Sequence, residues 1–246
     1  MTSFKKRAAG FCSFFYLLFL LHIPAEGAWE TVGNVIGVSR PKSNGAVLKT
    51  SSGARVAVEF FDVNVIRIRV APTGVFERDF SYAIDYSLNR TSPATRLAHT
   101  RNEIILTNHY GAKAIIRKAP FSIKIVDEAG GTVLEDDITR QTAFDKKTGG
   151  ISTTKLRRSE VETYYGFGEK AFMGMSRHGQ YIVNWNTDTF SYPIGTDPIY
   201  QAIPFFYALY EGKTYGLYFN NTFRTYFDMG KTSPDKYSFG ADNGEL

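Results

Sequence analysis

The hydropathy of this chain repeats every two residues from Trp29 onward, and this period most restricts the folds that it can adopt. Val65–Val70 alternates cleanly between apolar and polar side chains, and Val56–Phe60 has a similar strand-like composition. Further segments of this kind follow at 103–107, 112–117, 121–126, 132–134, 202–210, 215–219, 224–227 and 237–239. Glycine, asparagine and proline residues separate the earlier of these segments. The pattern predicts an all-β protein, either a sandwich or a barrel.

Helical periodicity is weak throughout the chain. No segment shows an amphipathic helix of ten or more residues, and Asp136–Phe144 is a candidate for only a turn or two. The polar and irregular stretch Phe76–Ala98 is expected to be a long connection that contains one strand. Because no repeat or low-complexity linker interrupts the sequence, residues 28–246 are expected to form one domain.

The amino terminus has the three parts of a secretory signal peptide. Lys5, Lys6 and Arg7 precede an unbroken apolar run, Phe14–Leu21, and small residues follow it up to Gly27. The run is shorter than the roughly 20 residues that a membrane-spanning helix needs, although an uncleaved anchor is the alternative. We therefore expect residues 1–27 to be removed and the protein to be secreted or periplasmic.

Charge and cysteine content exclude several classes of function. Removal of residues 1–27 takes away three basic residues and one acidic residue, so the net charge falls from +5 to +3. A weak, dispersed positive charge does not indicate nucleic-acid binding, which requires a clustered basic face. The single cysteine, Cys12, lies within the predicted signal peptide, so the mature chain has no disulfide. We predict no cofactor and no metal site.

The amino-acid composition changes near residue 164, where glycine, aromatic and charged residues occur close together without the period-two alternation. Six short blocks follow in order: Tyr165–Lys170 (YGFGEK), Arg177–Gly179 (RHG), Trp185–Asp188 (WNTD), Asp197–Phe206 (DPIYQAIPFF), Tyr215–Phe219 (YGLYF) and Phe227–Gly230 (FDMG). This ordered set resembles the amino-terminal domain of glycoside hydrolase family 31. The likeness is strong over residues 160–245 and only general over 29–160. Asn220 stands where the family often has an acid, a position that we interpret as structural.

The resemblance implies a fold and a reaction. Members of the family have a two-sheet antiparallel β-sandwich of the galactose-mutarotase type, followed by a (β/α)8 barrel. Two aspartates on that barrel hydrolyse α-linked sugars with retention, one as nucleophile and one as acid/base. The chain ends at Leu246, where the family would enter the barrel, so we expect no catalytic residue within this chain. The implied partners are an α-linked oligosaccharide or glycoside and a barrel in the same polypeptide.

The WNTD block supplies the candidate substrate-binding residues Trp185, Asn186 and Asp188. Sugar hydroxyls need directional partners such as carboxylates and amides, and sugar ring faces stack on aromatic rings. The resemblance implies that the acid of this block, here Asp188, reaches substrate hydroxyls across the barrel mouth. The alternative is a turn carboxylate that caps local N–H groups.

Other residues in this half are weaker candidates for binding a sugar. Glu169 is expected to be a structural acid paired with Lys170 or Arg177, although direct sugar binding is possible for its carboxylate. His178 could act as a base in a sugar epimerase, but without a matched acid a satisfied polar residue is the preferred interpretation. Gly166 and Gly168 are expected to form positive-φ turns.

A dinucleotide site is the main false match in the sequence. Residues 166–171 fit the pattern G-x-G-x-x-A, but no strand-to-helix context surrounds them. Two functions therefore remain: the amino-terminal domain of a retaining α-glycosidase, and a free-standing carbohydrate-binding sandwich without catalysis. A mutarotase-like isomerase is a distant third.

Overall fold

The computed structural model describes residues 28–85, 87 and 92–246, and their regular structure consists of β-strands. The predicted signal peptide, residues 1–27, lies outside the described residues. Within the described part, no helix is long and apolar enough to cross a membrane. The prediction of an all-β protein is confirmed.

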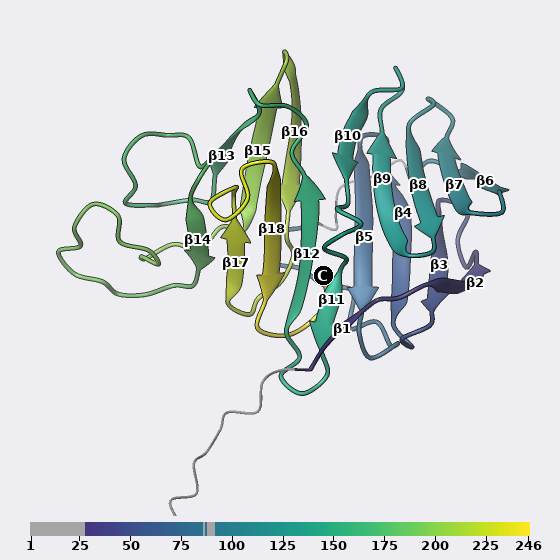
Figure 1. The fold of residues 1–246 in the computed structure, drawn as a ribbon, viewed down its shortest axis with the longest axis horizontal. Coiled ribbons are helices and arrows are strands. Elements are labelled where there is room, and N and C mark those ends of the chain that lie inside the picture. Colours follow the sequence, from purple (N-terminus) through teal and green to yellow (C-terminus); the bar gives the residue numbers. More distant parts are fainter. Residues whose placement is uncertain (1–27, 86, 88–91) are drawn as a thin grey trace, which may run out of the picture.

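One half of the molecule pairs a four-stranded sheet with a five-stranded sheet (Figure 1). The four-stranded sheet has the order β2-β3-β4-β5, with β2 (Val35–Ser39), β3 (Gly45–Thr50), β4 (Arg55–Asp62) and β5 (Val65–Ala71). The five-stranded sheet has the order β10-β9-β8-β7-β6, with β6 (Thr95–His99), β7 (Glu103–Asn108), β8 (Lys113–Lys118), β9 (Phe121–Val126) and β10 (Thr132–Glu135). All of these pairings are antiparallel.

The other half pairs a six-stranded sheet with a three-stranded sheet. The six-stranded sheet has the order β1-β11-β12-β18-β17-β14, with β1 (Trp29–Thr31), β11 (Ala143–Asp145), β12 (Ile151–Leu156), β14 (Tyr181–Asn184), β17 (Thr225–Asp228) and β18 (Lys236–Ala241). The three-stranded sheet has the order β13-β15-β16, with β13 (Thr163–Gly166), β15 (Phe205–Tyr210) and β16 (Lys213–Tyr218). The motif-bearing residues thus belong to this second half.

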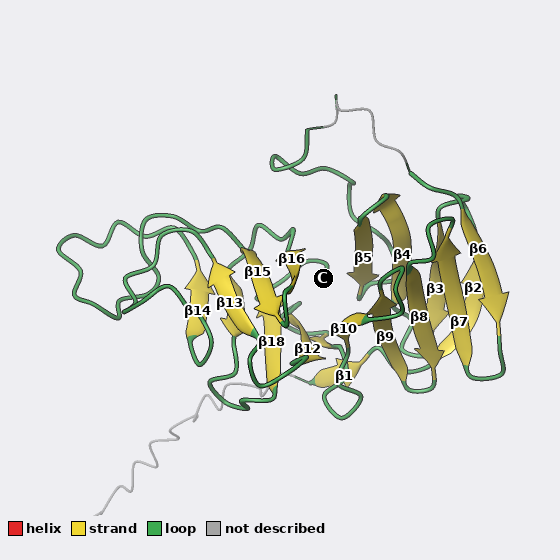
Figure 2. Cartoon of the chain, turned by 90° about the horizontal axis from the view of Figure 1, so that it is seen from above, coloured by secondary structure: helices red, strands yellow, loops and turns green. Residues whose placement is uncertain are grey.

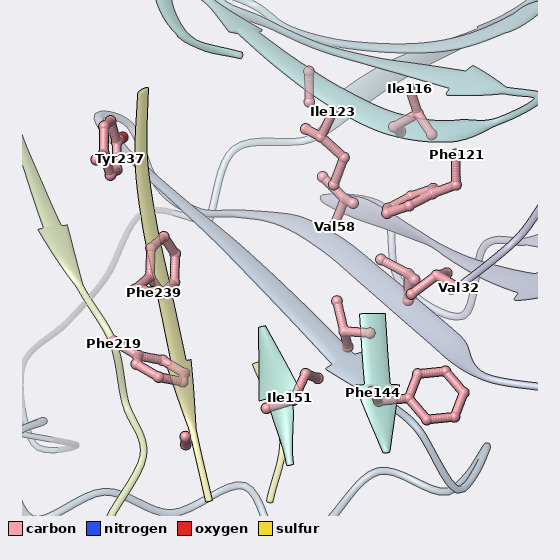
Figure 3. Packing of buried hydrophobic residues seen from close by; sticks show 14 of the residues in the cluster. Val32, Val58, Ile116, Phe121, Ile123, Phe144, Ile151, Phe219, Tyr237 and Phe239 are labelled. Atoms are coloured by element: carbon pink, nitrogen blue, oxygen red, sulfur yellow. The ribbon is translucent and has the colours of Figure 1, made fainter. Parts of the chain in front are cut away.

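One hydrophobic core runs through both halves (Figure 3). In the first half, aliphatic side chains such as Val58, Ile116 and Ile123 fill the space between the sheets. In the second half the core is aromatic: the rings of Phe206 and Tyr237 meet edge to face at 5.6 Å between centroids. Such aromatic pairs are each worth about 0.5–1.5 kcal/mol beyond the burial of their area. The high aromatic content of the chain is therefore concentrated beneath the motif-bearing residues.

The sheets are arranged in two layers, and each layer consists of two sheets placed edge to edge (Figure 2). A single bridge between Asp136 and Lys155 joins the five-stranded sheet to the six-stranded sheet. In the opposite layer, Leu246 exchanges two backbone hydrogen bonds with Val70 of β5. The expected sandwich is confirmed, but its two layers are not two continuous sheets. In the layer of the five- and six-stranded sheets, one isolated bridge is too short to continue the ladder across the junction.

The segment Asp136–Phe144, a candidate for a helical turn or two, instead contains one tight turn before β11. The Asp137 carboxylate accepts hydrogen bonds from the backbone N–H and the hydroxyl of Thr139, and its other oxygen pairs with Lys236. These side-chain contacts close a turn locally and compete with helix formation. The strand expected within Phe76–Ala98 is present at the end of that stretch, as β6.

Candidate functional site

Two long loops extend beyond β13 and β14 at one end of the molecule (Figures 1 and 2). We call residues 167–180 and 185–204 together the loop lobe. Neither loop contains a helix. A dinucleotide site would need a helix directly after Gly168 to hold the pyrophosphate at its amino terminus. The G-x-G-x-x-A match therefore has no structural basis.

The first loop leaves β13 through three successive residues with positive φ: Gly166 (127°), Phe167 (69°) and Gly168 (70°). A Cβ atom on Gly166 would lie 2.7 Å from the carbonyl oxygen of Phe205 on the neighbouring strand, so only glycine fits there. The expectation that both glycines occupy positive-φ turns is confirmed. Phe167 adopts this unfavourable conformation because its buried ring packs against Phe206 at 5.3 Å and Phe227 at 4.8 Å.

A buried ion pair ties the two loops to each other and to β14. The Lys170 ammonium lies 2.7 Å from one Asp197 oxygen and donates to the Val183 carbonyl, also at 2.7 Å. The other Asp197 oxygen accepts the Val183 backbone N–H at 2.6 Å. The two charged side chains are 0% and 6% exposed. Burial lowers the Lys170 pKa below its ordinary value, while the Asp197 carboxylate opposes that change.

The pairing expected for Glu169 is wrong. Lys170 pairs with Asp197, and the Arg177 guanidinium donates instead to the carbonyls of Gly166 and Gly174 at 3.4 and 3.1 Å. Glu169 is exposed, and one of its oxygens accepts a hydrogen bond from the Tyr192 hydroxyl at 3.2 Å. This hydrogen bond raises the Tyr192 pKa because it favours the protonated phenol.

The WNTD block follows β14 directly and begins the second loop. Thr187 fixes it in place, since its hydroxyl donates to the Pro198 carbonyl and lies 3.0 Å from the Thr189 hydroxyl. The flanking Asn186 and Asp188 are exposed. Among the residues that the structure describes, the Asp188 carboxylate has no hydrogen bond and no ion pair. The turn-capping alternative is therefore contradicted, and Asp188 presents two free acceptor oxygens to solvent.

Exposed aromatic side chains lie on the same loop as this carboxylate. Trp185 is 43% exposed even though the Arg224 guanidinium lies over its ring at 5.3 Å. Phe190 is 90% exposed. The Tyr200 hydroxyl donates to the Thr189 carbonyl, which fixes a further ring beside the segment. The loop lobe thus combines a free carboxylate, a free amide and open aromatic surface.

Comparison with known proteins assigns the chain to a family. The model of the glycosyl hydrolase 31 N-terminal galactose mutarotase-like domain matches residues 55–228, which is more than half of the chain. The chain belongs to this family. The match includes β13, β14 and both loops of the loop lobe, so the family domain contains the whole candidate site.

Relatives of this family 31 domain include an alpha-glucosidase and a dextranase. Alpha-glucosidase 2 of Bacillus thermoamyloliquefaciens is 29% identical over 192 residues, covering 78% of this chain and 23% of the relative. A family 31 dextranase of Flavobacterium johnsoniae, solved with isomaltotriose, has a TM-score of 0.76 at 27% identity, covering 88% of this chain and 26% of that chain. The cycloalternan-forming enzyme of Listeria monocytogenes, solved with a pentasaccharide substrate, shares the fold at TM-score 0.72 and 22% identity, covering 87% of this chain and 20% of that chain. The chain therefore spans about a fifth to a quarter of the length of these relatives.

His178 of the family 31 domain is half-buried, and its ring packs against neighbouring residues. A Cβ on Gly230 would lie 2.8 Å from its ring, and the Tyr164 ring lies 6.1 Å away. Burial lowers the His178 pKa, and the charge of Arg157 acts in the same direction. Its Nδ1 is buried without a partner in the described structure, so the expected satisfied polar residue is only partly correct. A half-buried imidazole with a lowered pKa and no paired acid does not support an epimerase.

The sequence did not reveal the Lys170–Asp197 pair, although each residue lies in a motif block. They are 27 positions apart, and nothing in the pattern of either block shows that they meet. The useful signal was that YGFGEK carries a lysine and DPIY an aspartate among glycine and apolar residues. Within the described residues, no group of three or more histidine, cysteine, aspartate or glutamate side chains could hold a metal ion.

Proposed function

We propose that this chain is the amino-terminal part of a longer family 31 hydrolase that acts on α-linked glucosides. Its membership of the family, and relatives that include an α-glucosidase and a dextranase, support this proposal. Those relatives are about four times as long as the matched region. A retaining glycosidase needs two carboxylates on opposite sides of the scissile bond. We propose that a barrel following this domain carries both of them.

The contribution of this chain is to form part of the substrate pocket through the loop lobe. The observation that carries the proposal is the state of Asp188, which is exposed and unpaired beside a firmly anchored Thr187. A carboxylate held in this way is a strong acceptor for sugar hydroxyls. Asn186 adds an amide that can both donate and accept, and Trp185 adds an aromatic surface. We propose that these three residues orient the sugar while the barrel carboxylates perform the chemistry.

The first test is to read the coding sequence past codon 246. A continuing frame that encodes a (β/α)8 barrel with two catalytic aspartates supports the hydrolase. A stop codon at that point favours the free-standing carbohydrate-binding sandwich instead. The 246-residue chain itself is expected not to hydrolyse an aryl α-glucoside. Turnover by the purified chain that persists through contaminant controls would contradict this assignment.

We also propose that the chain is exported after removal of residues 1–27. The basic start, the apolar run and the small residues before Ala28 support this proposal. Sequencing of the mature protein from the secreting cell should begin at Ala28. A mature protein that still begins at Met1 and stays with the membrane fraction would favour the uncleaved anchor.

A further inference from the structure

The outer face of the six-stranded sheet is hollowed into an open groove of about 860 Å³. A groove of this size is within the range of ordinary ligand sites. It does not include the loop lobe. Its floor is formed by the outward-facing residues of β12, β17 and β18, and its ends lie toward β1 and β14, the two edges of the sheet.

Aromatic rings stand at both ends of this groove. Trp29 of β1 is 54% exposed, and its ring lies directly over Gly150, where a Cβ would be 3.4 Å from the ring. At the other edge Tyr181 is 43% exposed, and its ring lies 6.4 Å from that of Tyr226, inclined by 31°. Since neighbouring strands are about 4.8 Å apart, the six strands span at most about 24 Å. This length suits an extended oligosaccharide better than a single sugar ring.

Small polar groups occupy the floor between the rings. Strand register places Asp228, Ser238 and Thr154 side by side in one row across β17, β18 and β12. In the adjacent row, Gly240 lies between Tyr226 and Ser152. The side-chain hydroxyls of the two serines and the threonine have no hydrogen-bond partner in the described residues. They are therefore available to a ligand as both donors and acceptors.

The charges around the groove favour a neutral ligand. Asp228 accepts hydrogen bonds from the backbone of Lys231 and Thr232, and Asp242 accepts one from the Tyr226 hydroxyl at 2.6 Å. Arg140 lines the same groove, so its charged lining residues leave one net negative charge, which disfavours a polyanion such as nucleic acid. A protein partner would require apolar side chains at the centre of the contact, where this groove has glycine and hydroxyls. A sugar chain satisfies both conditions, since its ring faces are apolar and its edges carry hydroxyls.

We propose that this groove, lined by Trp29, Ser152, Thr154, Tyr181, Tyr226 and Ser238, binds a short oligosaccharide of α-linked glucose units. The rings at the two edges stack on sugar faces, and the row of hydroxyls on the floor binds the sugar edges. The sugar-binding character follows from the groove alone. The choice of α-linked glucose rests on the proposed function, because the relatives act on such glucans.

The two tryptophans of the chain make the test selective, since Trp29 lies in the groove and Trp185 in the loop lobe. In a Trp185→Phe variant, the indole fluorescence and the indole N–H NMR signal come from Trp29 alone. Maltopentaose or isomaltopentaose is expected to shift that signal saturably. Tyr181→Ala in the same background should weaken binding at least about fivefold, because it removes one of the two aromatic rings at the ends of the groove. Tyr207→Ala, with 41% exposure on the three-stranded sheet, is the matched control and should change nothing.

Several outcomes would overturn the proposal. One is the absence of a saturable Trp29 signal up to the solubility limit of both pentasaccharides. Another is an equal loss of oligosaccharide affinity in Tyr207→Ala and Tyr181→Ala. A response confined to the Trp29→Phe variant would place the sugar on the loop lobe, which supports the proposed function but not this groove. Equal binding of cellopentaose would retain the groove and overturn the α-linkage. A dimer in sedimentation that Tyr181→Ala dissociates would make a second copy the occupant.

Discussion

Replacing Asp197 with alanine should destabilise the domain more than any change at an exposed charge. The substitution leaves the Lys170 ammonium, whose side chain is 0% exposed, without its counter-charge. It also removes the acceptor of the Val183 N–H. Breaking a buried pair by removing one partner costs about 3–5 kcal/mol. For a domain of this size that corresponds to a fall in Tm of about 6–20 °C.

A double variant separates the charge effect from the lost hydrogen bond. Lys170→Met combined with Asp197→Leu removes both charges and leaves the Val183 N–H without its acceptor and the Val183 carbonyl without its Lys170 donor. An unsatisfied buried donor costs about 1–3 kcal/mol, so the double variant should be more stable than Asp197→Ala. Glu30→Ala provides the control, because Glu30 and Lys146 form an exposed pair, with side chains 41% and 57% exposed. Its effect should stay within about 1 kcal/mol.

Chemical denaturation of the four proteins, with circular dichroism at a strand wavelength, measures these differences. Equal slopes against denaturant concentration would show that the comparison is one of stability alone. Two results would refute the reasoning: Asp197→Ala within about 1 kcal/mol of the wild type, or a double variant less stable than the single one. Either would mean that the ion pair seen between the loops is not maintained in solution.

Three further predictions concern the same half of the molecule. In a longer enzyme that contains the barrel, Asp188→Ala should lower kcat/KM for an aryl α-glucoside by roughly ten- to a hundredfold. Asp188→Asn should lose less activity, and both variants should keep the wild-type Tm. Full activity of Asp188→Ala would show that this residue is not a sugar ligand. Because the folded His178 pKa lies below its ordinary value, the unfolded chain binds the proton more readily, so stability should fall as pH drops below about 6.5. His178→Gln should remove that part of the pH dependence in thermal melts, and an unchanged profile would contradict it. Gly166→Ala should cost about 1–3 kcal/mol or more because of its positive φ and its contact with Phe205, whereas Gly195→Ala, with a positive φ but open space, should cost less in the same melts.

The strands were predictable where one face is buried by apolar side chains alone. Val65–Val70 is such a case, and it corresponds closely to β5. Strand β12, Ile151–Leu156, was missed because two of its inward-facing residues are polar. Thr153 shares a hydrogen bond with Thr142, and Lys155 pairs with Asp136 and lies over the Phe239 ring. Partners distant in sequence make these burials favourable, and no local pattern reports them.

The candidate site was predictable in composition but not in geometry. The WNTD block identified Asp188, Trp185 and Asn186, yet it left the turn-capping alternative open for the aspartate. Choosing between the two required knowing which N–H groups lie nearby, and these depend on how the second loop returns from Thr187 to Pro198. The groove on the six-stranded sheet could not be predicted from the sequence for a similar reason. Trp29 and Tyr181 are separated by most of the chain, and strand order alone places them at opposite edges of one sheet.

The buried contacts of the loop lobe bear directly on its function. A loop has no hydrogen-bond ladder of its own, so a binding residue on it is held only as firmly as the contacts beneath it allow. Here the Lys170–Asp197 pair joins both loops to the backbone of β14, and Asp188 lies four residues beyond the end of that strand. A carboxylate fixed in this way loses little freedom when it meets a sugar hydroxyl, which favours binding. If Asp188 binds the sugar as proposed, loosening the ion pair should weaken that binding, although Lys170 and Asp197 are themselves buried.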